Sequence, residues 1–122
     1  MKSEVIAIAL AGVVAGSSCT ANAAEQDGNE LLSNCKQFIS DDRGFNAFQA
    51  GECTGLIRGV SNTVYFYSEV LKSDDKFCVP DGVKNGQLAR IVVKYLEDNP
   101  KILNDPDIAL IWKALMDAYP CT

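Results

Sequence analysis

The sequence contains no histidine among its 122 residues. Imidazole is the group that most often moves protons in catalysis near neutral pH, and it commonly activates serine and cysteine nucleophiles. The acidic doublets at 41–42 and 74–75 do not replace it, because adjacent side chains point in different directions. A Cys-x-x-Cys pair and a phosphate-binding loop are also missing. We therefore expect a protein that is not an enzyme and that has no metal and no cofactor.

Clustered positive charge is missing as well. The chain carries 11 Lys and Arg against 16 Asp and Glu, and its basic residues are scattered along the sequence. A nucleic-acid-binding surface needs a positive patch that matches the phosphate backbone, so we predict no nucleic-acid partner. The formal net charge of −5 suits a basic protein partner, and it equally suits solubility alone.

A hydrophobic run of transmembrane length is absent. The longest apolar stretch covers only residues 5–16, whereas a membrane-spanning helix needs roughly 20 residues. Lys2 precedes this stretch and Ala21-Asn22-Ala23 follows it, which is typical of a cleaved export signal. We predict that residues 1–23 are a signal peptide and that residues 24–122 form one domain in the periplasm, not held in the membrane. A buried N-terminal helix is the alternative.

Cysteine is plentiful for a chain of this size. Removal of the signal peptide would leave four of the five cysteines, an even number in an oxidising compartment, which favours two disulfides. These four are Cys35, Cys53, Cys78 and Cys121. Three pairings are open, and antiparallel neighbouring helices favour Cys35–Cys53 with Cys78–Cys121. The fifth, Cys19, would carry a lipid if the signal were of the lipoprotein type, a second alternative for export.

Apolar residues recur at spacings of three and four, which predicts four helices. Their approximate ranges are 29–40, 50–72, 85–99 and 105–119. We expect Asn85 to cap the third helix, and Asp105 to cap the fourth with Pro106 in its first turn. Residues 63–67 favour a strand locally but continue the stripe of the second helix, so we expect them to be helical. The predicted fold class is all-α, a small disulfide-stapled bundle of four to five helices.

Three glycines stand four residues apart on one face of the second predicted helix. They are Gly51, Gly55 and Gly59. A glycine inside a helix costs about 1 kcal/mol relative to alanine, so three at this spacing indicate a surface that another backbone approaches closely. Two interpretations are open: close packing against the first or fourth helix of the same chain, or contact with a second copy in a homodimer.

Several short motifs stand in an order found in one known family. They are Gly51-Glu52-Cys53-x-Gly55-x-x-x-Gly59, Phe77-Cys78-Val79-Pro80, Gly86-Gln87-Leu88, Val93-Lys94-Tyr95-Leu96, Asn99-Pro100, Ala114-Leu115 and Tyr119-Pro120-Cys121. This order resembles the Rap/Tai type VI secretion amidase-immunity family over about residues 35–121. One departure is Leu56, where relatives often carry an aromatic residue.

The resemblance implies an all-helical periplasmic protein, often a homodimer, whose partner is a cysteine amidase effector that cuts peptidoglycan. Such a protein covers the active-site cleft of the amidase and needs no catalytic group. The family motifs consist mainly of glycine, cysteine and apolar residues, so we expect partner contacts in the exposed loops instead. The candidates are Asp74, Asp75, Lys76, Lys101, Asn104 and Asp105. Two alternatives are a periplasmic acid-stress chaperone and an orphan family member that has no toxin partner.

Overall fold

The structure is a computed structural model that describes residues 26–122, and in that range it is helical, with two isolated β-bridges and no strand. The predicted signal peptide and Cys19 lie outside the described residues. The elements are α1 (Gly28–Ile39), α2 (Ala47–Phe66), η1 (Ser73–Asp75), α3 (Asn85–Asp98), η2 (Pro100–Ile102) and α4 (Asp107–Ala118), η1 and η2 being single 3₁₀ turns. The predicted all-α fold is confirmed.

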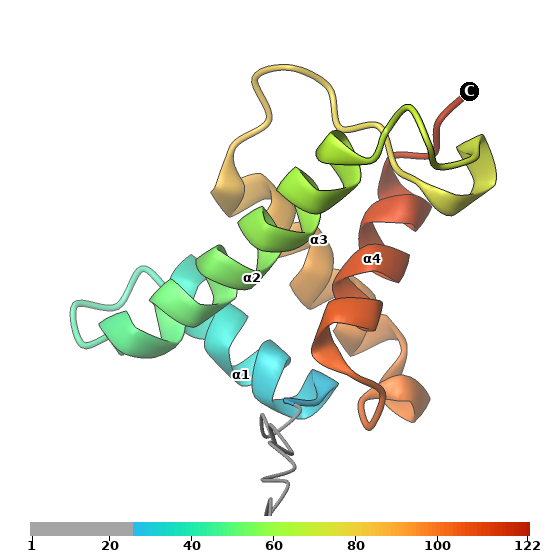
Figure 1. The fold of residues 1–122 in the computed structure, drawn as a ribbon. Coiled ribbons are helices and arrows are strands. Elements are labelled where there is room, and N and C mark those ends of the chain that lie inside the picture. Colours follow the sequence, from blue (N-terminus) through green and yellow to red (C-terminus); the bar gives the residue numbers. More distant parts are fainter. Residues whose placement is uncertain (1–25) are drawn as a thin grey trace, which may run out of the picture.

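The helices α2, α3 and α4 pack around α1, which contacts each of them. The helices α1 and α2 form an antiparallel hairpin, α3 passes behind them, and α4 stands beside α2 (Figure 1). The helix α2 runs diagonally across the front of the molecule, and no other described element covers its outer face (Figure 1). This arrangement leaves one long helix face open to a partner.

The core consists of the inward-facing side chains of all four helices. Its largest fully buried members are Leu31, Ile57, Leu96, Leu110, Ile111 and Leu115. The stripe predicted on α2 is buried from Cys53 to Val64, as expected from its spacing. On α4 the side chain of Ile108 is 54% exposed, whereas that of Leu110 is fully buried. The buried face of α4 is centred between Ile111 and Ala114, which places Ile108 on its flank.

The start of α4 also differs from the prediction. The helix begins at Asp107 rather than after an Asp105 cap, and Pro106 occupies the capping position. The reason is a short antiparallel bridge between Asp27 and Pro106. Here the N–H of Gly28 donates to the carbonyl of Asp105 (3.2 Å) and the N–H of Asp107 donates to that of Gln26 (3.0 Å). The bridge holds Pro106 extended, so α4 begins only at Asp107.

Two further helix ends are corrected. Asn85 is the first residue of α3 rather than its cap, because Lys84 precedes the helix and donates its N–H to Gln87 Oε1 at 2.8 Å. The helix α2 ends at Phe66, several residues earlier than predicted, and residues 67–70 form turns. The early end of α2 lets the chain turn toward α4 before η1 (Figure 1).

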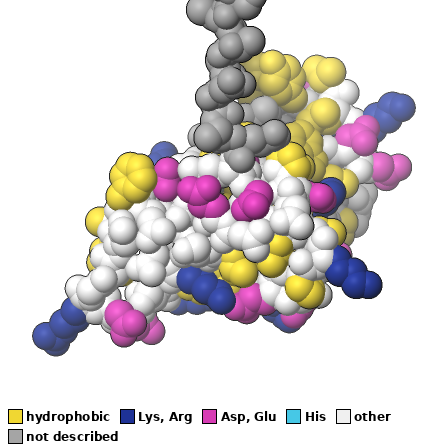
Figure 2. Space-filling model, turned by 90° about the horizontal axis from the view of Figure 1, so that it is seen from below, with side chains coloured by type: hydrophobic (Ala, Val, Ile, Leu, Met, Phe, Trp, Pro, Cys, Tyr) yellow, Lys and Arg dark blue, Asp and Glu magenta, His cyan; other side chains and the backbone are white. Residues whose placement is uncertain are grey.

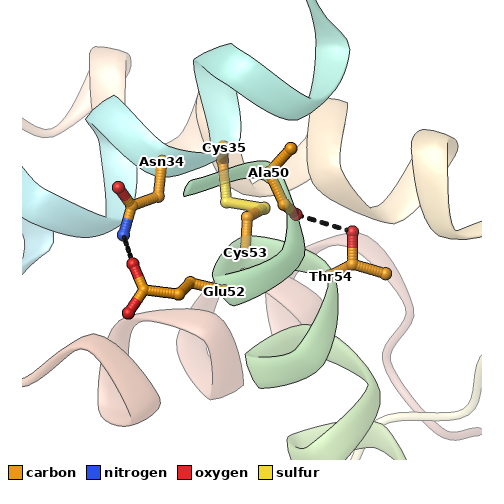
Figure 3. The surroundings of a disulfide bond; sticks show 6 residues. All are labelled: Asn34, Cys35, Ala50, Glu52, Cys53 and Thr54. Carbon is orange, nitrogen blue, oxygen red and sulfur yellow. Dashed lines mark hydrogen bonds between the residues drawn. A yellow bond between two sulfur atoms is a disulfide. The ribbon is translucent and has the colours of Figure 1, made fainter. Parts of the chain in front are cut away.

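Two disulfides hold the bundle, and their pairing is the one predicted for antiparallel neighbouring helices. Cys35–Cys53 joins α1 to α2 inside the core, with Cα atoms 5.0 Å apart (Figure 3). Cys78–Cys121 joins the segment before α3 to the segment after α4, with Cα atoms 5.1 Å apart. One bond therefore fixes the α1–α2 hairpin and the other fixes the opposite end of the molecule.

Candidate partner-binding site

The structure separates the two loops in which partner contacts were expected. The 72–76 loop, with η1, packs beside the C-terminal half of α4, whereas the 100–105 loop, with η2, precedes the N-terminus of the same helix (Figure 1). A helix of 12 residues is about 18 Å long. The six candidate residues therefore do not form one site.

The 100–105 loop is occupied by contacts within the protein. The carbonyl of Leu103 accepts the N–H of Asn29 at 3.2 Å, and the carboxylate of Asp105 pairs with Lys113 Nζ at 3.1 Å. The side chains of Lys101 and Asn104 are exposed. These bonds hold the start of α1 against the start of α4. Contacts within the protein therefore explain the conformation of this loop without a binding partner.

The 72–76 loop is anchored at both ends and exposed between them. Trp112 Nε1 donates to the carbonyl of Asp75 at 3.2 Å, and Lys76 Nζ donates to the carbonyl of Ser68 at 2.6 Å. The buried ring of Phe77 packs edge-on against Trp112, with centroids 6.2 Å apart. The residues Asp74 and Asp75 remain exposed. The loop thus presents two carboxylates on a fixed backbone.

A hollow of about 450 Å³ lies between this loop and the end of α2. Its lining residues are Ser61, Asn62, Val64, Tyr65, Ser68, Lys76, Phe77, Cys78 and Val79. Within the described residues, the buried Ser61 Oγ has no hydrogen-bond partner. Buried polar atoms usually have partners, so this hydroxyl is an exception in the wall of the hollow. Lys76 lines the same hollow, and its ammonium, which already donates to the carbonyl of Ser68, is a donor for a carbonyl or carboxylate.

Large apolar side chains are exposed at the end of α2 and in the turns that follow it. Tyr65 is 82% exposed and Val70 is 80% exposed, and Tyr65 lines the hollow itself. Exposed apolar residues that gather in one place mark interaction sites, and tyrosine is enriched at the energetic centres of interfaces. We call Tyr65, Val70, Asp74, Asp75 and Lys76 the α2-end surface. From the sequence we expected contacts at the charged members of this surface but not at Tyr65, in the last turn of α2, or at Val70, which the prediction placed in a longer α2.

The three spaced glycines face open space. Within the described residues, no atom of another element lies within 4 Å of a Cβ placed at Gly51, Gly55 or Gly59. The interpretation that they pack closely against another helix of the same chain is therefore wrong, because α2 buries the opposite side, through Ile57 and its neighbours. Contact with a second copy stays a prediction.

The close approach is found instead at Gly28, which the sequence did not single out. A Cβ there would meet Leu110 Cδ1 and would lie 2.9 Å from the carbonyl oxygen of Leu103. Both neighbours are more than 70 positions away in the chain. Local patterns carry no signal for such a contact, so only the packing of α1 on α4 reveals it.

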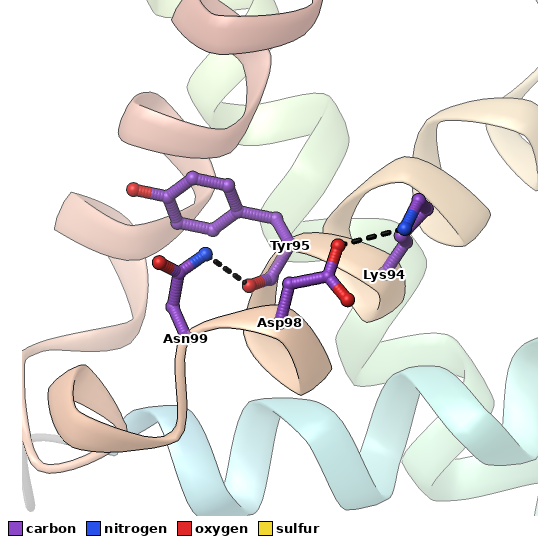
Figure 4. Close-up of polar contacts among 4 residues, drawn as sticks. All are labelled: Lys94, Tyr95, Asp98 and Asn99. Carbon is purple, nitrogen blue, oxygen red and sulfur yellow. Dashed lines mark hydrogen bonds and ion pairs between the residues drawn. The ribbon is translucent and has the colours of Figure 1, made fainter.

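A second hollow, of about 570 Å³, lies between α3 and α4. At its edge Lys94 Nζ pairs with Asp98 at 2.7 Å, and Asn99 Nδ2 donates to the carbonyl of Tyr95 at 2.7 Å (Figure 4). The hydrogen bond and the charge of Asp98 raise the pKa of Lys94 above its usual value. These contacts satisfy the C-terminal end of α3, so helix capping explains them without a ligand.

Within residues 26–122, neither the distribution of charge nor the placement of metal-binding side chains indicates a further site. In the view of Figure 2, acidic and basic side chains are interspersed among uncharged ones. Residues 26–122 contain no cluster of histidine, cysteine or carboxylate side chains that could hold a metal ion. Over the same range, no helix combines the length and the apolar character needed to cross a membrane.

Comparison with known proteins agrees with the motif order. The sequence model of the Rap1a immunity proteins matches residues 27–121, which include all four helices and both disulfides. No individual curated protein matches the chain. The match covers well over half of the sequence and confirms the resemblance to the immunity family. The chain belongs to the family of Rap1a immunity proteins.

Proposed function

We propose that this chain is a periplasmic immunity protein that binds a peptidoglycan-cleaving cysteine amidase delivered by type VI secretion, and that it covers the active-site cleft of that enzyme. Family membership implies immunity to a type VI effector. The amidase, the periplasm and export through residues 1–23 are our additions. Two disulfides in a chain of this size support an oxidising compartment, as the periplasm provides.

The α2-end surface is the observation that carries the proposal. Tyr65 and Val70 are almost fully exposed, and the backbone between them is held by the hydrogen bond from Lys76 Nζ to the carbonyl of Ser68. A fixed surface loses little conformational freedom on binding, which favours a tight complex. Inhibition by covering a cleft requires shape and contact area, both of which this surface offers.

The polar groups of the same surface complement a protein partner. Lys76 lines the hollow, and its ammonium can donate a hydrogen bond to a carbonyl or carboxylate of the amidase. Asp74 and Asp75 stand outside it and suit basic side chains at the rim of the contact. The apolar part of the hollow, around Phe77 and Val79, would receive the hydrocarbon stem of an amidase side chain whose carboxylate reaches Lys76.

The test is binding to a type VI amidase effector, sought first in the genes beside that of this chain and measured by calorimetry. We expect Tyr65→Ala to weaken the affinity at least about 30-fold, the loss typical of an interface hot spot. Reversing charge at Asp74 and Asp75 should weaken binding by a smaller factor that salt reduces. The matched control is Lys101→Ala in the other loop, which should bind as the unmodified chain does. Equal affinity of the Tyr65→Ala variant would remove this surface from the contact.

A homodimer is part of the proposal, and two rival functions remain to be tested against it. An acid-stress chaperone would also use exposed apolar side chains such as Tyr65 and Val70. Its binding of a hydrophobic dye should rise sharply on acidification, whereas an immunity protein should stay folded and bind one amidase stoichiometrically. An orphan member would have no amidase gene beside its own.

A further inference from the structure

The two disulfides of the protein differ in how far solvent reaches them. Both cysteines of Cys35–Cys53, which we call the inner disulfide, are fully buried between α1 and α2. In Cys78–Cys121, the outer disulfide, Cys78 is exposed and Cys121 is half-buried. A disulfide is reduced by a thiolate that must reach one of its sulfur atoms, so exposed disulfides are the labile ones. We therefore expect reduction to begin at the outer disulfide and to leave the inner one closed.

The charge beside Cys78 favours the same order. Lys76 and Cys78 both line the hollow at the α2-end surface. Within residues 26–122, Lys76 belongs to none of the ion pairs, and its ammonium donates to the carbonyl of Ser68. A neighbouring positive charge attracts an incoming thiolate and stabilises the thiolate that reduction leaves on Cys78. Lys76 thus makes the outer disulfide easier to attack and to open.

The outer disulfide fixes one wall of the hollow. Residues 76–79 line it, and Cys121 ties this segment to the chain that follows α4. The two segments also share an isolated β-bridge, in which the N–H of Cys78 donates to the carbonyl of Tyr119 at 2.8 Å. A single hydrogen bond near the surface holds two segments far more weakly than a covalent bond does. Opening the outer disulfide therefore frees the wall.

The rest of the bundle has its own supports. Its core consists of buried side chains from all four helices, and the inner disulfide holds α1 on α2. The helices α3 and α4 contact each other and α1 directly. We therefore expect the fold to persist when the outer disulfide alone is open, with the change confined to the α2-end surface.

We propose that Cys78–Cys121 is a redox switch, in which reduction by a dithiol frees residues 76–79 and weakens the binding of the α2-end surface to the amidase. A thiolate of the dithiol attacks Cys78 Sγ and forms a mixed disulfide, and Cys121 leaves as a thiolate that takes up a proton. The second thiol of the dithiol loses its proton, attacks the reductant's own sulfur in the mixed disulfide and releases Cys78. Two electrons and two protons have then passed to the protein, and the dithiol has become a disulfide. The inference rests on the proposed function, because it concerns the regulation of the same surface.

A bound amidase should in turn protect the outer disulfide. Cys78 lines the hollow that the amidase would cover, so the complex shields its sulfur atom. Linkage also requires that a partner that binds the oxidised form more tightly makes that form harder to reduce by the same factor. The switch therefore acts on chains that have not yet bound the amidase.

The first experiment measures the order of reduction and needs no amidase. The folded protein is treated with graded concentrations of dithiothreitol, and free thiols are alkylated with iodoacetamide and located by peptide mass spectrometry. Cys78 and Cys121 should be labelled at a dithiothreitol concentration at least about tenfold lower than Cys35 and Cys53. In Lys76→Gln the outer disulfide should need more dithiothreitol than in the unmodified chain. Labelling of both disulfides at the same concentration, or of the inner one first, would overturn the proposal.

The second experiment follows the wall of the hollow through the single tryptophan of the chain. Trp112 Nε1 donates to the carbonyl of Asp75 and the ring packs against Phe77, so its environment reports where this segment lies. Opening the outer disulfide should increase the quenching of Trp112 fluorescence by acrylamide, while the helical signal in circular dichroism stays the same. The control is Cys78→Ala/Cys121→Ala, which should be quenched as the reduced chain is and should not respond to dithiothreitol. Equal quenching of the oxidised and reduced chains would show that the wall stays in place, which would overturn the switch.

The third experiment measures the affinity for the amidase by calorimetry. Selective reduction should weaken binding at least about tenfold, within the usual range of coupling between two sites, and reoxidation should restore it. The variant Cys35→Ala/Cys53→Ala keeps only the outer disulfide and should show the same loss on reduction. An oxidised chain that does not bind the amidase would count against the proposed function alone. Equal affinity of the oxidised and reduced chains would count against the switch alone.

Discussion

Asn34 Nδ2 donates a hydrogen bond of 3.1 Å to Glu52 Oε2 directly beside the disulfide between the next residues in each helix, Cys35 and Cys53 (Figure 3). The Asn34 side chain is buried, at 1% exposure. Glu52 also accepts a longer hydrogen bond of 3.4 Å from Gln26 Nε2. A covalent bond and a polar contact thus hold α1 and α2 together at the same level of the hairpin.

Removal of the Glu52 carboxylate should destabilise the protein. In Glu52→Ala the buried amide of Asn34 loses this acceptor, and an unsatisfied buried polar group costs about 1–3 kcal/mol. Urea unfolding would measure the change in the free energy of unfolding. Glu69→Ala, at an exposed position after α2, is the matched control and should change that free energy by less than about 0.5 kcal/mol. Equal values for both variants would show that the contact contributes nothing.

Gly28 and Gly51 should respond in opposite directions to the same substitution. Gly28→Ala forces a methyl group against Leu110 and the backbone of Leu103, which should cost about 1–3 kcal/mol. Gly51→Ala adds the methyl group to an exposed helix position and should stabilise the fold by up to about 1 kcal/mol. Thermal unfolding of the two variants checks this prediction. A stable Gly28→Ala variant would show that α1 and α4 pack less closely than described.

The two disulfides should differ in what their loss affects. In the chain-entropy model, loops of 18 and 43 residues contribute about 3 and 4 kcal/mol respectively. Residues 76–79 line the hollow at the α2-end surface. The double variant Cys78→Ala/Cys121→Ala releases this segment, so this variant should bind the amidase more weakly even where the protein remains folded. The pair Cys35→Ala/Cys53→Ala should lose stability but keep the affinity of the folded fraction. Calorimetric titration of both variants separates these effects, and equal affinity losses would contradict the assignment.

The carboxylate of Asp27 should make stability depend on pH in the acid range. It caps α1, and hydrogen bonds from the N–H of Glu30 and the side chain of Asn29 lower its pKa below the usual value of 3.8. A lowered pKa in the folded state means that this contribution is complete well above pH 3.8 and is lost as the pH falls through the folded-state pKa. At neutral pH we therefore expect Asp27→Ala to melt at a lower temperature than the unmodified chain. The difference in melting temperature should shrink on acidification, and a difference that stayed constant with pH would contradict this role.

A feature can be predicted from the sequence when the interactions that produce it join residues close together in the chain. The buried stripe from Cys53 to Val64 was predicted because helical periodicity is a local property of the sequence. The start of α4 was not predicted correctly, because residues 105–107 form their backbone hydrogen bonds with residues 26–28, almost 80 positions earlier. The site shows the same division: the acidic loop was expected, whereas the exposure of Tyr65 depends on which side of α2 packs against the other helices.

The sequence by itself determined the four helices, the export-like start and the favoured cysteine pairing, since periodicity, composition and spacing express the preferences of each segment alone. Only the tertiary structure decided which glycine is closely packed and which glycines are open. The reason is that the side of a helix that becomes buried depends on neighbours contributed by distant parts of the chain. Gly28 lies under Leu110 and the spaced glycines of α2 face outward for that reason alone.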